Sequence, residues 1–237
     1  MYVGVGEEIF ARFPGYRRVM LLCEGMDNAS ESPFLTELLR SWEKKIREDP
    51  FLESYKEHPS IAAWQEAFRA LEVNPNKYPP SVANLVKRVR SGKDLPFINP
   101  LVCLFNIISM KYLIPCGGDD LRNVQEGVLL CLASGEERYV PLGQPDMTEY
   151  PDPGEVVLKD VQSGEIFCRK WCWKNGERSK IDTDSSRVAI NLDCMPPVEL
   201  STVQSAGEEL AGLIREQCGG SVGVHLLTPE SPRVAIW

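Results

Sequence analysis

The sequence predicts an α+β fold with a mixed, mainly antiparallel sheet and with its helices grouped in the N-terminal half. Two observations support this prediction. Apolar residues recur at helical spacing between residues 33 and 112, whereas short apolar runs between residues 127 and 192 are separated by Gly, Pro, Asp and Ser turns. Helices that precede the strands are typical of α+β folds, while parallel sheets are built from alternating units.

A buried strand and several helices are expected in the first half of the chain. Residues 17–23 form an apolar run, which predicts a buried strand followed by a turn at residues 25–28. Apolar stripes then predict helices at residues 33–48, behind Ser60, from Ser81 and at residues 100–112. We expect the hydroxyl of Ser81 to cap the third of these helices. The fourth is apolar nearly all round, so it should be buried.

After Gly117-Gly118 the apolar spacing changes from helical to strand-like. Strands are expected at residues 127–133, 138–142, 155–159, 166–173 and 188–192. A helix at residues 203–218 and a strand at residues 222–227 should follow.

The segment from Gly117 to Asp120 has two interpretations. Local reasoning favours a turn in which Asp119 or Asp120 caps the next element of the chain. The functional interpretation is a glycine-lined pocket wall, where a ligand can approach the backbone closely.

Composition excludes some classes of function. The formal net charge of -8 argues against a protein that coats nucleic acid non-specifically, so no DNA partner is expected, although an acidic body can carry a local basic patch. No apolar run approaches about 18 residues, and no basic and apolar leader opens the sequence, so we expect neither a membrane span nor a signal peptide. Most of the eight cysteines lie in apolar runs, which favours reduced thiols in a cytoplasmic protein. The length suits a single domain over residues 1–237.

The cysteine and histidine positions point to no metal and no cofactor. Cys168 and Cys172 are the only close pair, and strand geometry would place both thiols on one face as core residues. His58 is expected in a solvated loop, and His225 in the core or at a strand edge. The spacing of these residues reveals no hydrolytic triad.

A resemblance to a known family rests on three blocks of sequence: Asn99-Pro100-Leu101-Val102-Cys103-Leu104-Phe105-Asn106, Ile114-Pro115-Cys116-Gly117-Gly118-Asp119-Asp120 and Asn175-Gly176-Glu177-Arg178-Ser179-Lys180-Ile181. In order and spacing they resemble the B3/B4 domain of the bacterial phenylalanyl-tRNA synthetase β subunit, which houses that enzyme's editing site. Trp171-Cys172-Trp173 before the last block is similar to stand-alone B3/B4 proteins. The resemblance covers roughly residues 60–200 and implies a B3/B4-like fold, with residues 1–59 and 201–237 as family-variable flanks on the core.

The resemblance also implies roles for particular residues. Glu177 falls on the loop glutamate that recognises the hydroxyl of a mischarged tyrosine, and Gly117 falls on a histidine that helps to position the ester. Glu177, Gly117 and Gly118 are therefore the candidate catalytic residues. The candidates for substrate binding are Asn99, Asn106, Cys116, Trp173 and Ser179. The candidates for tRNA binding are Lys87, Arg88, Arg90, Lys174, Arg178 and Lys180.

Two functions are implied by the resemblance. The first is trans-editing, in which the protein hydrolyses mischarged aminoacyl-tRNA; such a deacylase would not be a complete synthetase. The second is a non-catalytic module that binds tRNA, aminoacyl-tRNA or a free amino acid, which the glycine at position 117 favours. Trp171 and Trp173 would alternate along one strand face, either as core residues or as a platform for a terminal adenine.

Overall fold

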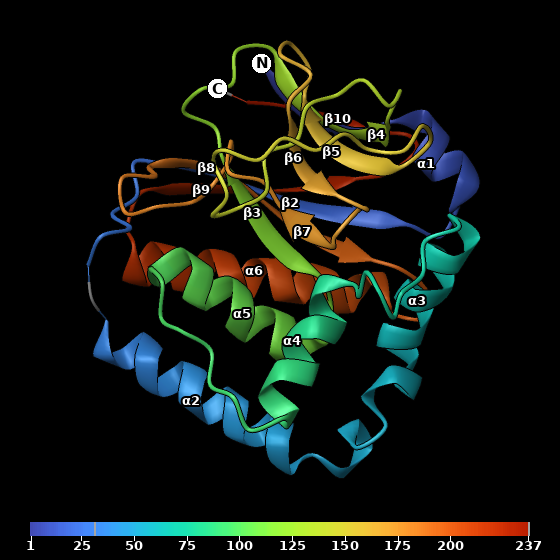
Figure 1. Cartoon of the computed structure of the whole chain (residues 1–237). Helices are drawn as coiled ribbons and strands as arrows, with labels where there is room; N and C mark the ends of the chain where they lie inside the picture. The colour runs from blue at the N-terminus through green and yellow to red at the C-terminus, as the bar shows by residue number, and fades with distance from the viewer. Residues whose placement is uncertain (31, 237) are drawn as a thin grey trace.

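Two β-sheets face each other, and a layer of helices covers the outer face of one of them (Figure 1). The computed structural model describes residues 1–30 and 32–236. The strands of sheet A lie in the order β10 (Arg233–Ala235), β1 (Tyr2–Val5), β4 (Gly127–Leu132), β5 (Val156–Asp160), β6 (Ile166–Arg169) and β7 (Lys174–Asn175). Those of sheet B lie in the order β3 (Cys116–Asp120), β8 (Arg187–Cys194), β2 (Arg17–Glu24) and β9 (Ser221–Leu227).

Most strand pairs are antiparallel, and the pair of β1 with β4 is parallel. Helices are concentrated in the N-terminal half: α1 (Glu7–Arg12), α2 (Pro33–Glu48), α3 (Pro59–Ala70), α4 (Ser81–Arg90) and α5 (Pro100–Tyr112), with α6 (Leu200–Gln217) near the C-terminus. Two short 3₁₀ turns lie at Pro50–Leu52 and Tyr55–Glu57. This arrangement confirms the predicted α+β class and its mainly antiparallel pairing.

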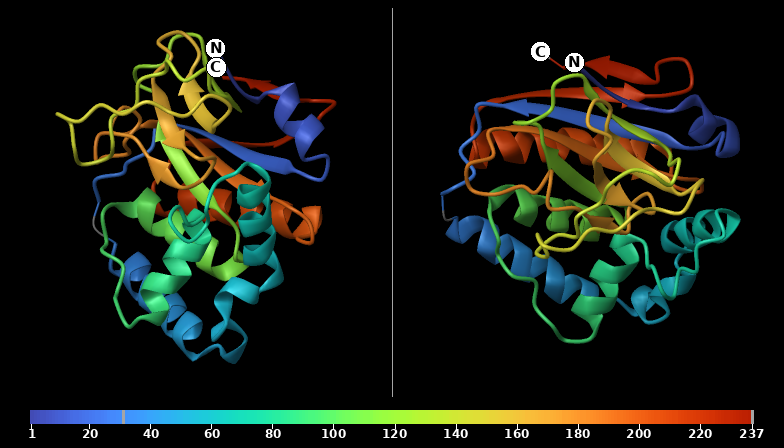
Figure 2. Two further views of the ribbon diagram at one scale, coloured as in Figure 1. Left: turned by 45° about the vertical axis from the view of Figure 1, so that its right-hand side comes forward. Right: turned by 45° about the horizontal axis from the view of Figure 1, so that its top comes forward.

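Helix α5 forms the centre of the helical layer. It lies between α2 on one side and sheet B on the other, with α6 beside it (Figures 1 and 2). Its side chains are buried on nearly every face, as the apolar sequence predicts. The observed bounds of α2 and α5 coincide with the predicted ones. None of the described helices is long and apolar enough to cross a membrane.

Successive side chains of β2 point to opposite faces of sheet B, one toward the helices and the other toward sheet A. Val19 packs against α6 so closely that a Cβ added at Gly207 would lie 2.7 Å from it. Arg18 and Met20 point the other way, because side chains alternate along a strand, and they line a narrow space between the two sheets. Arg18 of this strand is therefore held between the sheets, with Asp119 and Asn191 beside the same space.

Several local predictions were wrong. Residues 138–142 form only isolated bridges at Tyr139 and Pro141, since Pro141 has no amide hydrogen to donate to a ladder. Ser81 does not cap α4: it is the first residue of the helix, and its amide donates to the carbonyl oxygen of Cys172 at 2.8 Å. The segment Gly117 to Asp120 is strand β3 and not a turn. The short elements β1, α1 and β10 were not predicted.

Strand β6 ends earlier than predicted. Lys170 and Trp171 have left-handed backbones, with φ of 48° and 64°, so the strand stops at Arg169. Trp171 and Trp173 consequently do not alternate along one strand face, and Cys168 and Cys172 do not share one. The turn carries the Trp171 ring into the core, where it packs edge-on against Tyr16 and Trp64.

A buried ion pair joins the central strands of sheet B. Arg18 of β2 stands opposite Asp193 of β8, and its Nε and Nη2 donate to the two carboxylate oxygens at 2.7 and 3.1 Å. The Tyr16 hydroxyl donates to the same carboxylate at 2.6 Å. Burial disfavours the charge of Arg18, but Asp193 more than offsets this, and the pKa of the guanidinium is raised. Both side chains are almost fully excluded from solvent, so each depends on the other.

Removing the charge of Asp193 should destabilise the whole fold. In Asp193→Asn the Arg18 guanidinium stays buried without a counter-ion, and we expect unfolding free energy to fall by about 3–5 kcal/mol in urea titrations. Glu24→Gln is the matched control, because it weakens the exposed pair with Arg187 at the other end of the same two strands. It should cost at most about 1 kcal/mol. Equal losses in the two variants would contradict the assignment.

Candidate functional site

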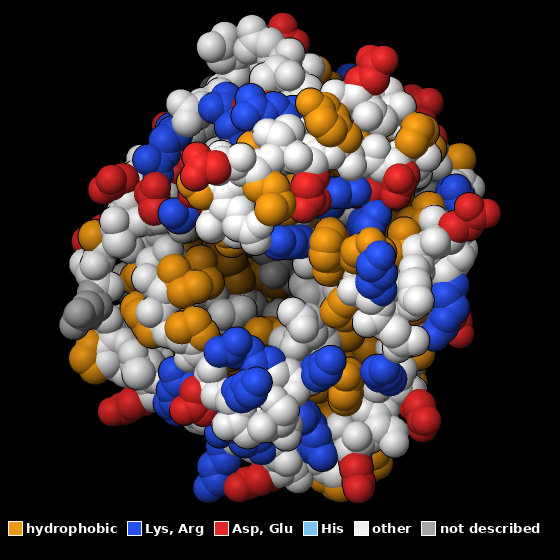
Figure 3. Space-filling view, viewed as in Figure 1, with side chains coloured by type: hydrophobic (Ala, Val, Ile, Leu, Met, Phe, Trp, Pro, Cys, Tyr) orange, Lys and Arg blue, Asp and Glu red, His pale blue; other side chains and the backbone are white. Residues whose placement is uncertain are grey.

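A cavity of about 380 Å³ opens where the two sheets meet helices α4 and α5. Figure 3 shows the hollow near the centre of the face seen in Figure 1, with hydrophobic side chains beside it and Lys and Arg side chains around it. Val102 and Phe105 of α5 and Ile181 of the loop after β7 contribute apolar walls. Trp171 and Trp173 also line it. A cavity of this lining suits a small ligand with a large apolar part.

The two glycines of β3 serve the cavity differently. A Cβ added at Gly118 would lie 2.8 Å from the Phe105 ring and 3.1 Å from Ile181, so only glycine lets helix α5 pack this closely. A Cβ added at Gly117 would meet no atom within 4 Å, and Gly117 lines the cavity. Position 117 therefore has room for a side chain where the resemblance places a histidine.

The floor of the cavity is polar and lies between the sheets. Asp119 of β3, Arg18 of β2 and Asn191 of β8 all line it. Asp119 is only 4% exposed, and the Ser179 hydroxyl donates to its carboxylate at 2.6 Å. Desolvation raises the pKa of Asp119 to about 6, although the Ser179 hydrogen bond and the charge of Arg18 act in the opposite direction. Asn191 donates to Asp193 at 3.1 Å.

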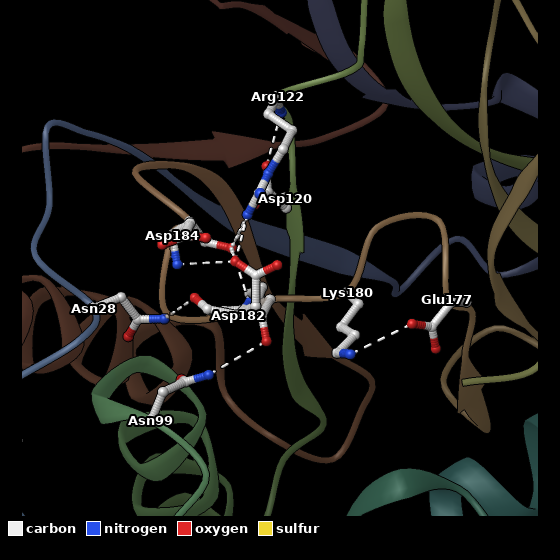
Figure 4. A network of polar contacts seen from close by, with 10 residues as sticks. Asn28, Asn99, Asp120, Arg122, Glu177, Lys180, Asp182 and Asp184 are labelled. Carbon is white, nitrogen blue, oxygen red and sulfur yellow. Dashed lines mark hydrogen bonds and ion pairs between the residues drawn. The ribbon is translucent and has the colours of Figure 1, made fainter. Parts of the chain in front are cut away.

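Glu177 lies at the rim and not among the lining residues. Its carboxylate accepts the Gly143 amide hydrogen at 2.7 Å and pairs with the ammonium group of Lys180 at 3.4 Å (Figure 4). The Gly143 hydrogen bond lowers the pKa of Glu177. Gly143 and Lys180 themselves line the cavity, so Glu177 holds two parts of its mouth together.

Asn99 and Asn28 support the cavity through the loop that carries Ile181. The Asn99 side chain accepts the Val102 amide at the start of α5, and its Nδ2 donates to the carbonyl oxygen of Ile181 at 3.3 Å. Asn28 holds the next residue in the same way, with its Nδ2 at 2.7 Å from the carbonyl oxygen of Asp182 (Figure 4). These amides fix the loop that carries Ile181 into the wall.

Arg122 holds the far side of that loop. Its guanidinium contacts the carboxylates of Asp120 and Asp182, each at 2.5 Å, in the network of Figure 4. Asp120 points away from the cavity floor, since neighbouring residues of a strand face opposite sides of the sheet. The two carboxylates after Gly117-Gly118 therefore have separate roles: Asp120 in loop anchoring and Asp119 in the cavity.

The predicted substrate and tRNA residues occupy different surroundings. Asn106, Cys116 and Trp173 line the cavity. Lys87 and Arg88 are exposed on α4, and Lys174 lies beside the Trp173 ring near the cavity. Arg90 instead donates to the carbonyl oxygens that end α2, and Arg178 pairs with Glu165 at 2.8 Å. The structure thus engages Arg90 and Arg178 in internal contacts, and the guanidinium of Arg88 also donates to the carbonyl oxygen of Asp94 at 3.1 Å.

No nucleophile or metal centre is evident in the described part of the cavity. Cys116, Cys168 and Cys172 line it, and burial raises the pKa of all three thiols, which keeps them protonated. Neither His58 nor His225 is among the lining residues. The described residues contain no cluster of His, Cys, Asp or Glu that could hold a metal ion.

Sequence reasoning missed the two charged residues of the floor. The sequence indicates Asp119 only as a helix or turn cap, because its burial depends on the packing of two sheets. Arg18 precedes an apolar run and has no local feature that indicates a site. Its strand partner Asp193 is 175 residues away in sequence, so the pair becomes visible only in the folded chain.

The chain matches the sequence profile of the B3/4 domain over residues 63–219. Among solved structures, it is similar to the N-terminal fragment of the phenylalanyl-tRNA synthetase β subunit from Pyrococcus horikoshii. The identity is 12% and the TM-score is 0.48, with 93% of this chain and 49% of that chain covered. The chain therefore spans about half the length of that fragment. No curated protein matches the chain.

The raised pKa of Asp119 predicts a stability change with pH. Its protonated form is favoured in the folded state, so its contribution to stability is present below the unfolded value of 3.8 and is lost as pH rises through about 6. Asp119→Asn should therefore raise the unfolding free energy by about 2–3 kcal/mol at pH 8, and the gain should shrink toward pH 4. Urea titrations of the two proteins from pH 4 to pH 8 measure this difference in unfolding free energy. A difference that does not change with pH would contradict the prediction.

Removal of the Glu177 carboxylate should loosen the mouth of the cavity. In Glu177→Ala the Gly143 amide loses its acceptor, and we expect its hydrogen exchange to quicken about 5-fold, since a hydrogen bond contributes about 1 kcal/mol net. Amide exchange followed by NMR measures this. Glu136→Ala, at an exposed side chain of the preceding loop, should leave the Gly143 rate unchanged. Unchanged exchange in Glu177→Ala would show that the rim does not depend on this contact.

Proposed function

The chain belongs to the B3/4 domain family, and from this membership we propose that the protein hydrolyses the ester of a wrongly attached amino acid on tRNA. Family membership supports a tRNA-related role. The observation that carries the finer proposal is the largely apolar cavity with open space beside Gly117, built largely from the matched residues.

The size and lining of the cavity favour an amino-acid moiety as its occupant. Its volume of about 380 Å³ lies at the lower end of the roughly 300–1,000 Å³ typical of ligand sites. Phe105, Ile181 and Trp171 would surround an apolar side chain. The terminal ribose and base would then remain at the mouth, beside Lys180 and Trp173, where a base can stack on an aromatic ring.

Cations near the mouth would hold the acceptor end of the tRNA. Lys174 and Lys180 lie beside the cavity, and Lys87 and Arg88 are exposed on α4, whose first residue Ser81 lines it. Phosphate contacts position a nucleic acid without reading its bases. On a protein with a net charge of -8, such a patch would bind tRNA locally and would not coat it.

The proposed reaction is direct hydrolysis by a positioned water molecule. Water adds to the ester carbonyl carbon, the bond from that carbon to the ribose oxygen breaks, and a proton passes to the ribose oxygen. The products are a free amino acid and a tRNA hydroxyl group. Because neither histidine lines the cavity and its thiols are protonated, positioning and the neighbouring ribose hydroxyl would supply the catalysis. Glu177 would contribute to selection by shaping the mouth, and Gly117 and Gly118 by shaping the wall.

A non-catalytic binding module is the second candidate. The same lack of an imidazole or thiolate in the described lining favours it. In this case the cavity would hold an amino acid, or the tRNA acceptor end would dock at its mouth, without release of the ester.

Release of the amino acid from mischarged tRNA separates the two candidates, and filling the cavity at Gly117 tests whether release occurs there. We expect the wild-type protein to release the amino acid from one of a panel of mischarged tRNAs, and Gly117→Val to slow that release about 100-fold, since its side chain would displace the substrate. Release is followed by acid precipitation of radiolabelled aminoacyl-tRNA. Gly212→Val, the same change at an open position of α6, should retain activity. A panel without release, with tRNA still bound, would leave the binding module.

A further inference from the structure

We propose that the cavity selects amino acids whose α-ammonium group is charged and whose carboxyl group is esterified or amidated, and that it rejects free amino acids. The reason is that the Asp119 carboxylate in its floor has no cationic partner among the described residues, whereas Arg18 is already paired with Asp193. This inference deepens the proposed function, on which it rests for its physiological substrate. It can be tested without tRNA.

The charges of the floor do not balance. The Arg18 guanidinium is neutralised by Asp193 through two hydrogen bonds. Tyr16 and Asn191 donate to the same Asp193 carboxylate and complete its set of partners. Among the described residues, the Asp119 side chain receives a hydrogen bond only from the Ser179 hydroxyl. The floor therefore carries one negative charge without a counter-ion, and a buried charge in that condition is costly unless a ligand neutralises it.

No other group described around Asp119 supplies an unpaired positive charge that would balance its carboxylate. From β2 it faces Arg18, which is paired with Asp193 of β8, and from β6 it faces the protonated thiol of Cys168. Asp120, its neighbour on β3, is a further negative charge and is bound to Arg122. The remaining cation of the lining, Lys180, pairs with Glu177 at the rim. A cationic ligand is the partner that this arrangement lacks.

An aminoacyl ester meets this requirement and a free amino acid does not. The ester carries a single positive charge on its α-ammonium group, which would pair with Asp119. A free amino acid brings a carboxylate as well, which the unneutralised Asp119 would repel. Hydrolysis converts the first ligand into the second, so the product would be expelled by the charge that bound the substrate.

Ligand pairs that differ only at the carboxyl group test this selectivity. We would titrate the wild-type protein by calorimetry at pH 7, above the pKa of about 6 of Asp119 and below the usual α-amino pKa of about 7.7–8.0. The ligands are phenylalanine, leucine, methionine, tyrosine and tryptophan, each as its amide and as the free acid. We expect at least one amide to bind, and to bind at least 10-fold tighter than its acid. 3-Phenylpropanamide, which lacks the ammonium group, should not bind. Equal or tighter binding of the free acids, or no binding of any amide, would overturn the proposal.

Variants assign the preference to Asp119. Asp119→Asn should weaken amide binding at least 10-fold and bring the amide and acid affinities together. Asp152→Asn is the matched control, because it removes a carboxylate that is 88% exposed, and it should keep the wild-type preference. In the wild type the preference should also decline below pH 6, as Asp119 becomes protonated. A preference that survives in Asp119→Asn, with the fold verified by circular dichroism, would overturn the assignment.

Failure of this inference and failure of the proposed function give different results. If the protein prefers amides but releases no amino acid from any tRNA, the proposed selectivity of the cavity is supported and the proposed hydrolase activity is overturned. If the protein releases an amino acid from tRNA but binds the free acid tightly, the proposed hydrolase activity is supported and the proposed selectivity is overturned.

Discussion

The buried ion pair between Arg18 and Asp193 is the constraint on which the site depends. It fixes β2 against β8 in the middle of sheet B, and it places Tyr16 and Asn191 around one carboxylate. Because Arg18 is paired with Asp193, none of the described cations forms an ion pair with the neighbouring Asp119. The stability of the sheet and the charge of the cavity are thus two results of one pairing.

The walls of the cavity are held by contacts that lie outside it. Asn28 and Asn99 bind the backbone of the loop that carries Ile181, and Arg122 holds the same loop through Asp182. At the mouth, Glu177 joins Gly143 to Lys180. A cavity supported in this way keeps its shape without a ligand, so binding would need little reorganisation. Residues with no access to a ligand can therefore still decide how well one fits.

The sequence predicted those features whose cause is local. Helices α2 and α5 begin at prolines and carry continuous apolar stripes, and both were predicted with the correct bounds. The end of β6 was not, because the left-handed backbones of Lys170 and Trp171 result from core packing of the Trp171 ring. The resemblance singled out Gly117 and Gly118, which line the cavity. It did not single out Asp119, whose burial beside Arg18 arises from strands far apart in sequence.

The position of β2 in sheet B has a consequence for synthesis of the chain. Its sheet partners are β8 and β9, and Asp193 lies 175 residues after Arg18. At about 5–20 residues per second, the ribosome would need roughly 10–35 s to supply the first partner strand. During that time the apolar residues of β2 have no strand to pair with, and an unpaired strand invites contact with other chains. Chaperones that shield nascent apolar segments would thus act on this protein before its cavity exists, and the cavity would be among the last parts to form.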